Sequence, residues 1–174
     1  MTTVTKTTAA PKTSAASKAS PAPKAPAAAK DAIAMLKAEH GAVSALFADY
    51  EKADSRKKKK AIVAEICAEL SVHVQVEEEI FYPPFKAALK DKVLVPEAVV
   101  EHGGIKELIA QLEGAEPDGE IYDAKVKVLS EYVEHHVKEE QTGMFAKAKT
   151  TALDLVELGA RMATRKAELI AARG

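Results

Sequence analysis

The segment from Ile62 to Phe81 places a histidine and a carboxylate within a helical face that is otherwise apolar. Residues on this face recur at steps of three and four, the spacing of one side of an α-helix: Ile62, Ile66, Leu70, His73, Glu77 and Phe81. Burying an ionised carboxylate without a partner is very costly, so Glu77 needs one. A metal ion shared with His73 would be such a partner. For a single histidine–glutamate pair, a buried hydrogen bond between the two side chains is an equally good explanation.

A second pair with the same spacing occurs in the segment Glu120–Lys147, where two adjacent histidines are each followed four residues later by a glutamate. At about 100° per residue, His136 and Glu140 fall near the midline of the apolar face. His135 and Glu139 fall on its flank. We therefore expect His136 and Glu140 to point inward, and His135 to lie at the surface or behind the ligands.

Two further histidines lie within apolar stripes. His40 belongs to the segment Asp31–Lys52, and His102 to a segment that begins near Pro96. Four of the five histidines thus occupy four successive apolar faces. Mixed imidazole and carboxylate ligands suit iron or manganese, and the lack of thiolates argues against a structural zinc site.

The periodicity predicts an all-α protein, an up-down four-helix bundle with an additional C-terminal helix. The predicted helices are Asp31–Lys52, a second from the polar run Asp54–Lys60 to Tyr82, a third from Pro96 to Leu112, Glu120–Lys147, and a fifth from about Asp154 to Ala172. Pro83-Pro84 should end the second helix, followed by a linker or short helical turn over Phe85–Val95.

Gly103-Gly104 should thin the third helix, so that backbone, water or a small ligand can approach. The fifth helix should pack against the bundle or against another subunit, which leaves the oligomeric state open.

Residues 1–30 differ in composition from the rest of the chain. They consist almost entirely of Ala, Thr, Ser, Pro and Lys, with five lysines and no acidic residue. This composition predicts a disordered tail, followed by a bundle domain over 31–148 and a C-terminal helix over 149–174. We interpret the tail as solubilising. A weak contact of its lysines with nucleic acid or another polyanion is the alternative, and we expect no other nucleic-acid partner.

Cys67 is the single cysteine, so no disulfide can form within the chain. Its place at the edge of an apolar face favours a small packed side chain over a reactive thiol. No apolar run approaches the roughly 20 residues that span a bilayer, and the N-terminus has no apolar core typical of a secretory signal. We therefore expect a cytoplasmic protein without a membrane partner.

On these residues the chain resembles the hemerythrin-like, HHE cation-binding domains. The resemblance covers roughly Asp31–Lys147 and rests on four motifs: Glu39-His40, His73-x-x-x-Glu77 followed by Ile80-Phe81-Tyr82-Pro83, Glu101-His102-x-x-Ile105, and His136-x-x-x-Glu140 followed by Gly143-Met144-Phe145-Ala146. It implies a non-haem di-iron centre with an oxo or hydroxo bridge, inside a four-helix bundle. It also implies that the terminal iron ligands are His40, His73, His102 and His136, and that Glu77 and Glu140 bridge the irons.

The same resemblance implies a protein that binds or reacts with O₂, peroxide or NO, in the response to oxidative or nitrosative stress or in sensing oxygen or iron. A redox enzyme with catalase-like, peroxidase-like or oxidase activity is the alternative, so whether the protein turns over a substrate stays open. The oxygen-carrying hemerythrins have a further histidine where this chain has Lys106. That departure argues against simple reversible carriage of oxygen.

Overall fold

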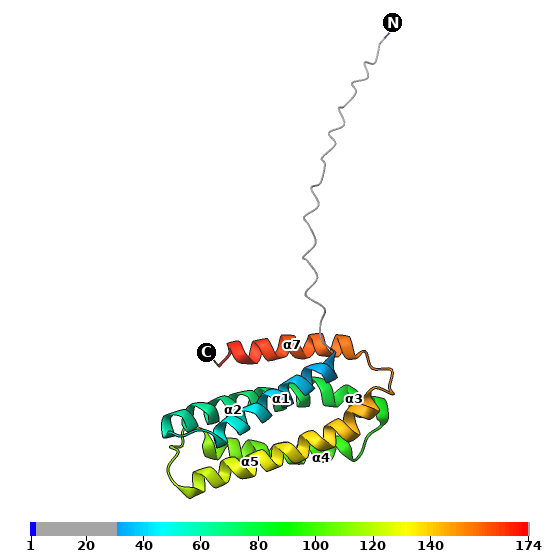
Figure 1. Ribbon diagram of the computed structural model, residues 1–174. Coiled ribbons are helices and arrows are strands. Elements are labelled where there is room, and N and C mark those ends of the chain that lie inside the picture. Colours follow the sequence, from blue (N-terminus) through cyan, green and yellow to red (C-terminus); the bar gives the residue numbers. More distant parts are fainter. Residues whose placement is uncertain (3–30, 174) are drawn as a thin grey trace.

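The computed structural model describes residues 1–2 and 31–173, and this part of the chain is helical with short loops (Figure 1). The predicted tail over residues 1–30 therefore lies, except for its first two residues, outside the described part. In chain order the elements are α1 (Ala32–Glu51), α2 (Arg56–Val76), the π-helix η1 (Glu77–Phe81), α3 (Tyr82–Leu89), α4 (Leu94–Leu112), α5 (Glu120–Glu139), the π-helix η2 (Glu140–Met144), α6 (Phe145–Ala148) and α7 (Leu155–Ala171). The predicted all-α class is confirmed.

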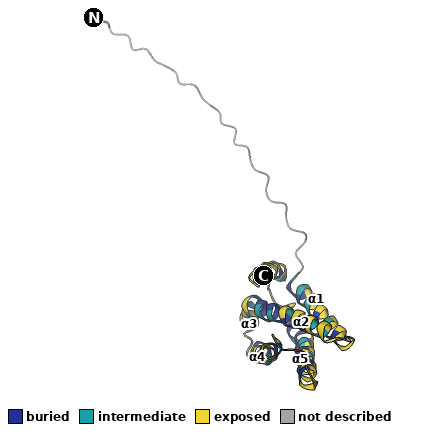
Figure 2. Ribbon diagram, turned by 90° about the vertical axis from the view of Figure 1, so that its left-hand side faces the viewer, coloured by how far each residue is buried: buried dark blue, intermediate teal, exposed yellow. Residues whose placement is uncertain are grey.

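Four of these helices form the bundle. Helix α1 packs against α2 and α5, and α4 packs against the same two, so that the four surround one interior. Their buried faces point inward, as the end-on view shows (Figure 2). Short loops connect helices that lie beside each other, which is the arrangement expected of an up-down bundle.

The interior contains two apolar clusters along the length of the bundle. One includes Leu36, Phe81 and Phe145, and the other includes Val43 and Leu129. The buried polar side chains lie between them, because His40 follows Leu36 by one helical turn and precedes Val43 by another. The fold therefore encloses its polar groups between two apolar layers.

Helix starts follow the predicted caps. The side chain of Asp31 accepts a hydrogen bond from the backbone N–H of Ala34 at 2.9 Å, so the folded body begins where the sequence indicates. Asp154 caps α7 in the same way, accepting from the N–H groups of Val156 and Glu157. Both caps satisfy donors that the first turn of a helix leaves without a partner.

The prediction that Pro83-Pro84 ends the second helix is wrong. The chain continues from α2 through η1 into α3, which ends only at Leu89. Both prolines lie in the first turn of α3, directly after the π-helix. A proline is tolerated in the first turn because its missing N–H needs no partner there. Lys90, with φ 51°, ends α3 in the left-handed conformation.

The predicted fifth helix is present as α7. It lies along α1 and α2, on the outside of the bundle (Figure 1). Leu158 and Met162 are its buried contacts with the bundle. We expected this helix to pack against the bundle or against another subunit, and the structure shows it packed against the bundle of the same chain.

The glycine pair of α4 lies beside a side chain of α5. A Cβ added to Gly104 would lie 3.1 Å from the ring of Tyr132 on α5, whereas one added to Gly103 would meet no atom within 4 Å. The missing side chain at Gly104 therefore lets α5 pack closely against α4. We expected backbone, water or a small ligand to approach this glycine pair, and the structure places the ring of Tyr132 beside it.

Among the helices of the described part, none has the length and apolar character needed to cross a membrane.

Candidate metal centre

The six predicted ligands meet inside the bundle, and none of them is more than 6% exposed. They come from every helix of the bundle and from both π-helices: His40, His73, Glu77, His102, His136 and Glu140. The Nε2 atoms of His40 and His73 lie 3.1 Å apart, and those of His102 and His136 also lie 3.1 Å apart. The imidazoles thus form two pairs.

The two carboxylates lie between these pairs. Oε2 of Glu77 is 3.3 Å from Nε2 of His73 and 3.4 Å from Nε2 of His102. Oε2 of Glu140 is 3.4 Å from Nε2 of His40 and 3.8 Å from Nε2 of His136. Each glutamate therefore faces one histidine of each pair, as a carboxylate that bridges two ions does.

The ligand atoms form two groups, each compact enough for one ion. In each group the atoms lie within 4.8 Å of one another. The first half-site is made of His40, His73, Glu77 and Glu140, and the second half-site of Glu77, His102 and His136. Glu77 belongs to both groups, so the two half-sites share an edge.

Two carboxylate oxygens in this cluster have no hydrogen-bond partner among the described residues. They are Oε1 of Glu77 and Oε2 of Glu140, both fully buried. An unpartnered buried carboxylate oxygen is costly, and a cation removes that cost. These two atoms are the first evidence that the cluster fits metal ions.

Behind the imidazoles lie three further glutamates, which we call the outer carboxylates: Glu39, Glu78 and Glu101. Each accepts a hydrogen bond from the Nδ1–H of a cluster histidine, at 2.8 Å for His73, 3.0 Å for His102 and 2.7 Å for His136. A neutral imidazole with its proton on Nδ1 points the lone pair of Nε2 into the cluster. With that tautomer in both rings, the lone pairs of His102 and His136 would face each other across 3.1 Å, an arrangement that a cation bound by both would stabilise.

His40 has a different neighbour. Its Nδ1 lies 3.5 Å from the side-chain amide nitrogen of Gln141, and no outer carboxylate contacts it. Burial, together with the charge of His73, lowers the pKa of His40 to about 4. The ring is therefore neutral at neutral pH, the form in which histidine binds metals.

The two glutamates of the cluster have opposite pKa shifts. Burial raises the pKa of Glu140 well above its usual range, and the charge of Glu77 raises it further. Burial opposes ionisation of Glu77 as well, but His73 and His102 outweigh it and lower the pKa of Glu77 below its usual range. The shifts favour a proton on Glu140 over one on Glu77 in the metal-free protein. Two cations would let both ionise.

Each H-x-x-x-E motif ends at the start of a π-helix. The N–H of Tyr82 donates to the carbonyl of Glu77, and the N–H of Phe145 donates to the carbonyl of Glu140, five residues back in each case. The extra residue in the turn rotates Tyr82 and Phe145 onto the face of the ligands. Our helical stripe, continued at the ordinary period, assigned Phe81 to this position instead.

Tyr82 is the site residue that the sequence reasoning missed. Its hydroxyl donates to Oε1 of Glu140 at 3.0 Å and lies 3.2 Å from Nε2 of His102. Burial raises the pKa of Tyr82 well above its usual range, and the charges of Glu77 and Glu140 add to this. The signal in the sequence was an aromatic residue five positions after each glutamate, Tyr82 and Phe145.

Lys106, which stands where the oxygen carriers have a histidine, points away from the cluster. Its Nζ lies 2.7 Å from both carboxylate oxygens of Glu78, and its side chain is 50% exposed. Lys106 therefore supports an outer carboxylate and leaves the interior of the second half-site to Tyr82.

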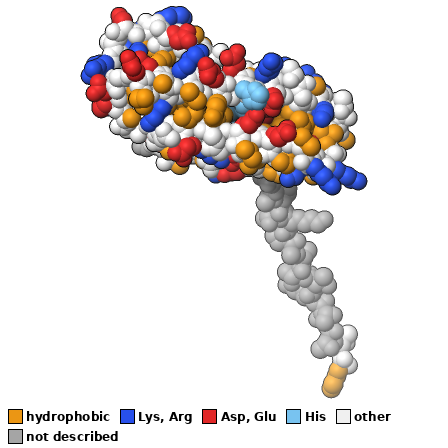
Figure 3. Space-filling model, turned by 90° about the horizontal axis from the view of Figure 1, so that it is seen from below, with side chains coloured by type: hydrophobic (Ala, Val, Ile, Leu, Met, Phe, Trp, Pro, Cys, Tyr) orange, Lys and Arg blue, Asp and Glu red, His pale blue; other side chains and the backbone are white. Residues whose placement is uncertain are grey.

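His135 lies at the surface, as the helical wheel predicts. Its side chain is 63% exposed, and its Nε2 is 3.3 Å from Glu101 and 3.4 Å from Glu139. Figure 3 shows a face of the molecule on which histidine surface is surrounded by acidic side chains. Through Glu101, His135 contacts a residue that holds His136, so it lies behind the ligands as well.

The cluster approaches the solvent beside His40. A hollow of about 560 Å³ between α1 and α5 is lined by His40, Phe47, Val133, Val137 and Gln141, among others. Val133 and Val137 also line an enclosed apolar space of about 10 Å³ next to the imidazoles. That space is close to the smallest that holds one water-sized molecule. The hollow and this small space share His40, Val133 and Val137 as lining residues.

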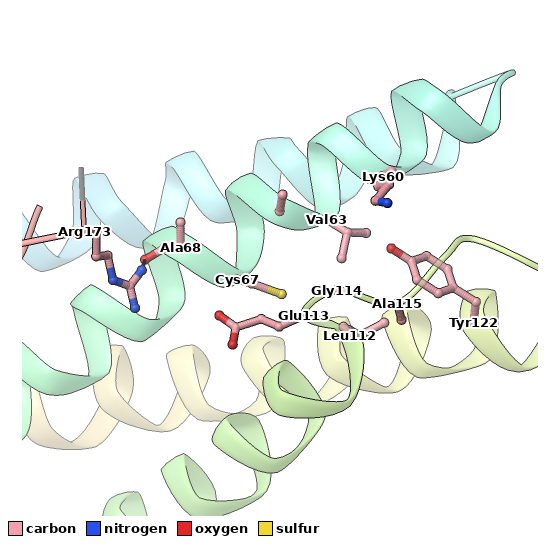
Figure 4. Close-up of a pocket in the computed structure, with 11 residues that line it drawn as sticks. Lys60, Val63, Cys67, Ala68, Leu112, Glu113, Gly114, Ala115, Tyr122 and Arg173 are labelled. Atoms are coloured by element: carbon pink, nitrogen blue, oxygen red, sulfur yellow. Dashed lines mark hydrogen bonds between the residues drawn. The ribbon is translucent and has the colours of Figure 1, made fainter.

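Another cavity, of about 180 Å³, lies away from the cluster, between α2, the end of α4 and the start of α5 (Figure 4). Cys67 lines it, and burial raises the pKa of the Cys67 thiol to about 11. The prediction of an unreactive, packed cysteine agrees with this environment.

Comparisons with known proteins point to one family. The sequence model of the hemerythrin HHE cation-binding domain matches residues 31–148. A crystal structure of a hemerythrin HHE cation-binding domain-containing protein from Mycobacterium kansasii superposes with a TM-score of 0.69 at 25% identity, covering 80% of this chain and 87% of that one. A DNA nickase from Nostoc sp. is 24% identical over 112 residues, which is 64% of this chain and 32% of the nickase. The chain thus spans about a third of that relative. Together with the buried histidine–glutamate cluster, the family match shows that the chain belongs to the hemerythrin HHE cation-binding domain family.

Proposed function

We propose that this protein holds two iron ions in the cluster and that the iron pair reacts with O₂, peroxide or NO. The observation that carries the proposal is the shared pair of buried carboxylates. Glu77 and Glu140 each face both imidazole pairs, and each has an oxygen without a partner among the described residues. One ion would leave an imidazole pair unused, whereas two ions use every ligand.

The residues divide between the ions as follows. His40 and His73 would hold one ion, His102 and His136 the other, and Glu77 and Glu140 would bridge them. Imidazole and carboxylate ligands together suit iron, although manganese prefers a similar set. Iron bound here would supply electrons to a small oxidant such as O₂ or peroxide.

Tyr82 makes the two half-sites unequal. Its hydroxyl lies within hydrogen-bond distance of Nε2 of His102, so it is placed as an oxygen ligand for the second ion. The equivalent residue beside His40 is Phe145, whose ring stacks on the imidazole with centroids 5.9 Å apart and offers no oxygen. We infer that the small molecule meets the ion held by His40 and His73.

With Lys106 in place of a histidine, one coordination position on the second ion would have no histidine ligand. Tyr82 fills that position in our proposal, so the open position lies on the first ion, beside the apolar space near His40. The chain contributes a narrow space there, lined by Val43, Val133 and Val137 among others.

Reaction of the chemically reduced, iron-loaded protein with air and with peroxide, followed optically, tests the function. We expect oxidation by both, without a long-lived oxygenated form, and no such reaction after iron is removed with a chelator. An oxygenated spectrum that disappears on flushing with inert gas and returns over many cycles would show a carrier instead. Multiple turnovers of peroxide would favour the enzyme over the sensor.

A further inference from the structure

The C-terminal helix reaches the cluster through a lysine. Helix α7 lies beyond residues 31–148, which the family model matches. Nζ of Lys166 is 2.9 Å from Oε1 of Glu39 and 3.1 Å from Oε2 of Glu69. The other oxygen of Glu39 accepts the Nδ1–H of His73 at 2.8 Å. An unbroken chain of hydrogen bonds therefore runs from α7 through Glu39 to a candidate metal ligand.

We propose that Lys166 is a positioning residue for the metal centre: it fixes Glu39 against His73 and thereby raises the reduction potential of the iron pair. The inference rests on the proposed function. It assigns to the additional helix a role in the redox properties of the centre, beyond packing.

The surroundings of Glu39 make this contact a strong one. Its side chain is 12% exposed and that of Lys166 is 21% exposed, so solvent screens their interaction only partly. Burial opposes the charge of Glu39, yet the hydrogen bonds from His73 and Lys166 lower its pKa below the usual range. Glu39 is therefore an anion that both neighbours hold in place.

The bundle repeats the arrangement on the second half-site. There Lys106 contacts Glu78, and Glu78 accepts from His102. Each lysine thus neutralises an outer carboxylate that orients one imidazole. The difference is that Lys106 comes from the bundle, whereas Lys166 comes from α7.

Helix α7 is fixed where Lys166 needs to be. Arg165, the preceding residue, donates from Nε to Oε2 of Glu79 at 2.6 Å, and Glu79 lies in η1 two residues after Glu77. On the buried side, Met162 is fully enclosed by the core. The lysine is therefore tied to the same π-helix that carries a bridging carboxylate.

Removing the positive charge of Lys166 has two effects of the same sign. Glu39, no longer neutralised, attracts the Nδ1 proton of His73 more strongly, which makes Nε2 a more basic ligand. A nearby positive charge is also lost, which favours the more highly charged oxidised metal. Both effects move the reduction potential to more negative values.

The test is the reduction potential of the iron-loaded protein in the wild type and five variants. We expect Lys166→Met to shift it negatively, Lys166→Arg to restore most of the value, and Lys127→Met to leave it unchanged. Lys127 is a matched control because, among the described residues, its ion pair is with Glu131 on α5, and its side chain is 64% exposed. In a Glu39→Gln background, Lys166→Met should give a clearly smaller shift, since the part transmitted by the carboxylate is gone and only the direct effect of the charge remains.

A second readout needs no metal. In the metal-free protein the Nδ1–H resonance of His73 reports its hydrogen bond to Glu39, and Lys166→Met should move that resonance whereas Lys127→Met should not. An unchanged potential and resonance in Lys166→Met would overturn the inference, as would an equal shift in the Glu39→Gln background. Failure of the proposed function looks different, because the wild-type protein would then show no iron-based potential at all.

Discussion

Tyr82 and Phe145 occupy equivalent positions on the two halves of the bundle. Each donates its backbone N–H across a π turn to a buried glutamate, and each stacks on a histidine. The ring of Tyr82 lies 5.4 Å from that of His102, and the ring of Phe145 lies 5.9 Å from that of His40. A single hydroxyl group distinguishes the two positions, so the two half-sites share a geometry and differ in their chemistry.

Tyr82→Phe should therefore open the second half-site to an external ligand. We expect the variant to keep its iron and to bind azide in the oxidised state about tenfold more tightly, the equivalent of about 1.4 kcal/mol. Optical titration with azide measures this. Tyr132→Phe is the control, since it removes a hydroxyl from an exposed tyrosine outside the cluster. Equal azide affinity in Tyr82→Phe and wild type would remove Tyr82 from the proposed ligand set.

The two adjacent histidines of α5 should differ sharply in their effect on metal content. His136→Ala removes a buried imidazole that faces His102, whereas His135→Ala alters an exposed side chain. We expect His136→Ala to lose most of the bound iron and His135→Ala to retain nearly all of it. Elemental analysis of the two purified variants decides the matter. Loss of iron only in His135→Ala would mean that the metal binds at the surface, at His135 and Glu139.

Metal removal should destabilise the fold. Without cations the cluster buries unpartnered carboxylate oxygens, and ligands that bind only the folded state add to its stability. With free metal at about a thousand times its dissociation constant, the gain is about 4 kcal/mol. That corresponds to a melting temperature roughly 10 °C higher for a chain of this size. Calorimetry of the chelated and iron-loaded forms checks this, and coincident transitions would count against a central metal site.

The metal-free protein should respond to pH through Glu140. Its pKa is raised by burial and by Glu77, so the folded state keeps a proton that the unfolded chain releases. The stability that this proton supports is present below the ordinary pKa of a glutamate and is lost as the pH rises toward the folded value. Glu140→Gln carries an uncharged amide that does not titrate.

Urea unfolding of the chelated proteins from about pH 5 to about pH 8 provides the measurement. We expect the free energy of unfolding of the wild type to fall relative to Glu140→Gln as the pH rises. A difference that stays constant over this range would mean that Glu140 ionises normally in the folded chain.

The sequence was sufficient to predict the helices and the inward-facing histidines, because the period of 3.6 residues is the strongest signal in an α-helical chain. His136 and His135 were separated correctly on that basis alone. The period also caused the main error, since it does not indicate where one extra residue enters a turn. Each π-helix begins at a buried glutamate of the cluster, so Tyr82 lies in the cluster where the continued stripe placed Phe81.

The error at Pro83-Pro84 has the same origin. A proline pair usually ends a helix, but these two follow a π-helix and begin a new α-helical segment, where their missing N–H groups need no partner. Glu39 and Glu101 stand in the motifs of the resemblance, but the contacts of the outer carboxylates escaped prediction for another reason. Glu39 and Glu78 look like ordinary surface residues in sequence, and only the packing of α7 and α4 brings Lys166 and Lys106 to them.

The central claim is that Glu77 and Glu140 bridge two ions, and iron stoichiometry combined with Mössbauer spectroscopy tests it most directly. We expect about two irons per chain, with the oxidised pair coupled to a state without net spin at low temperature. Glu77→Ala should lower both the iron content and the coupling, whereas Glu139→Ala, an exposed residue four positions after His135, should change neither. A wild-type protein that binds a single iron, or two irons without magnetic coupling, would contradict the account.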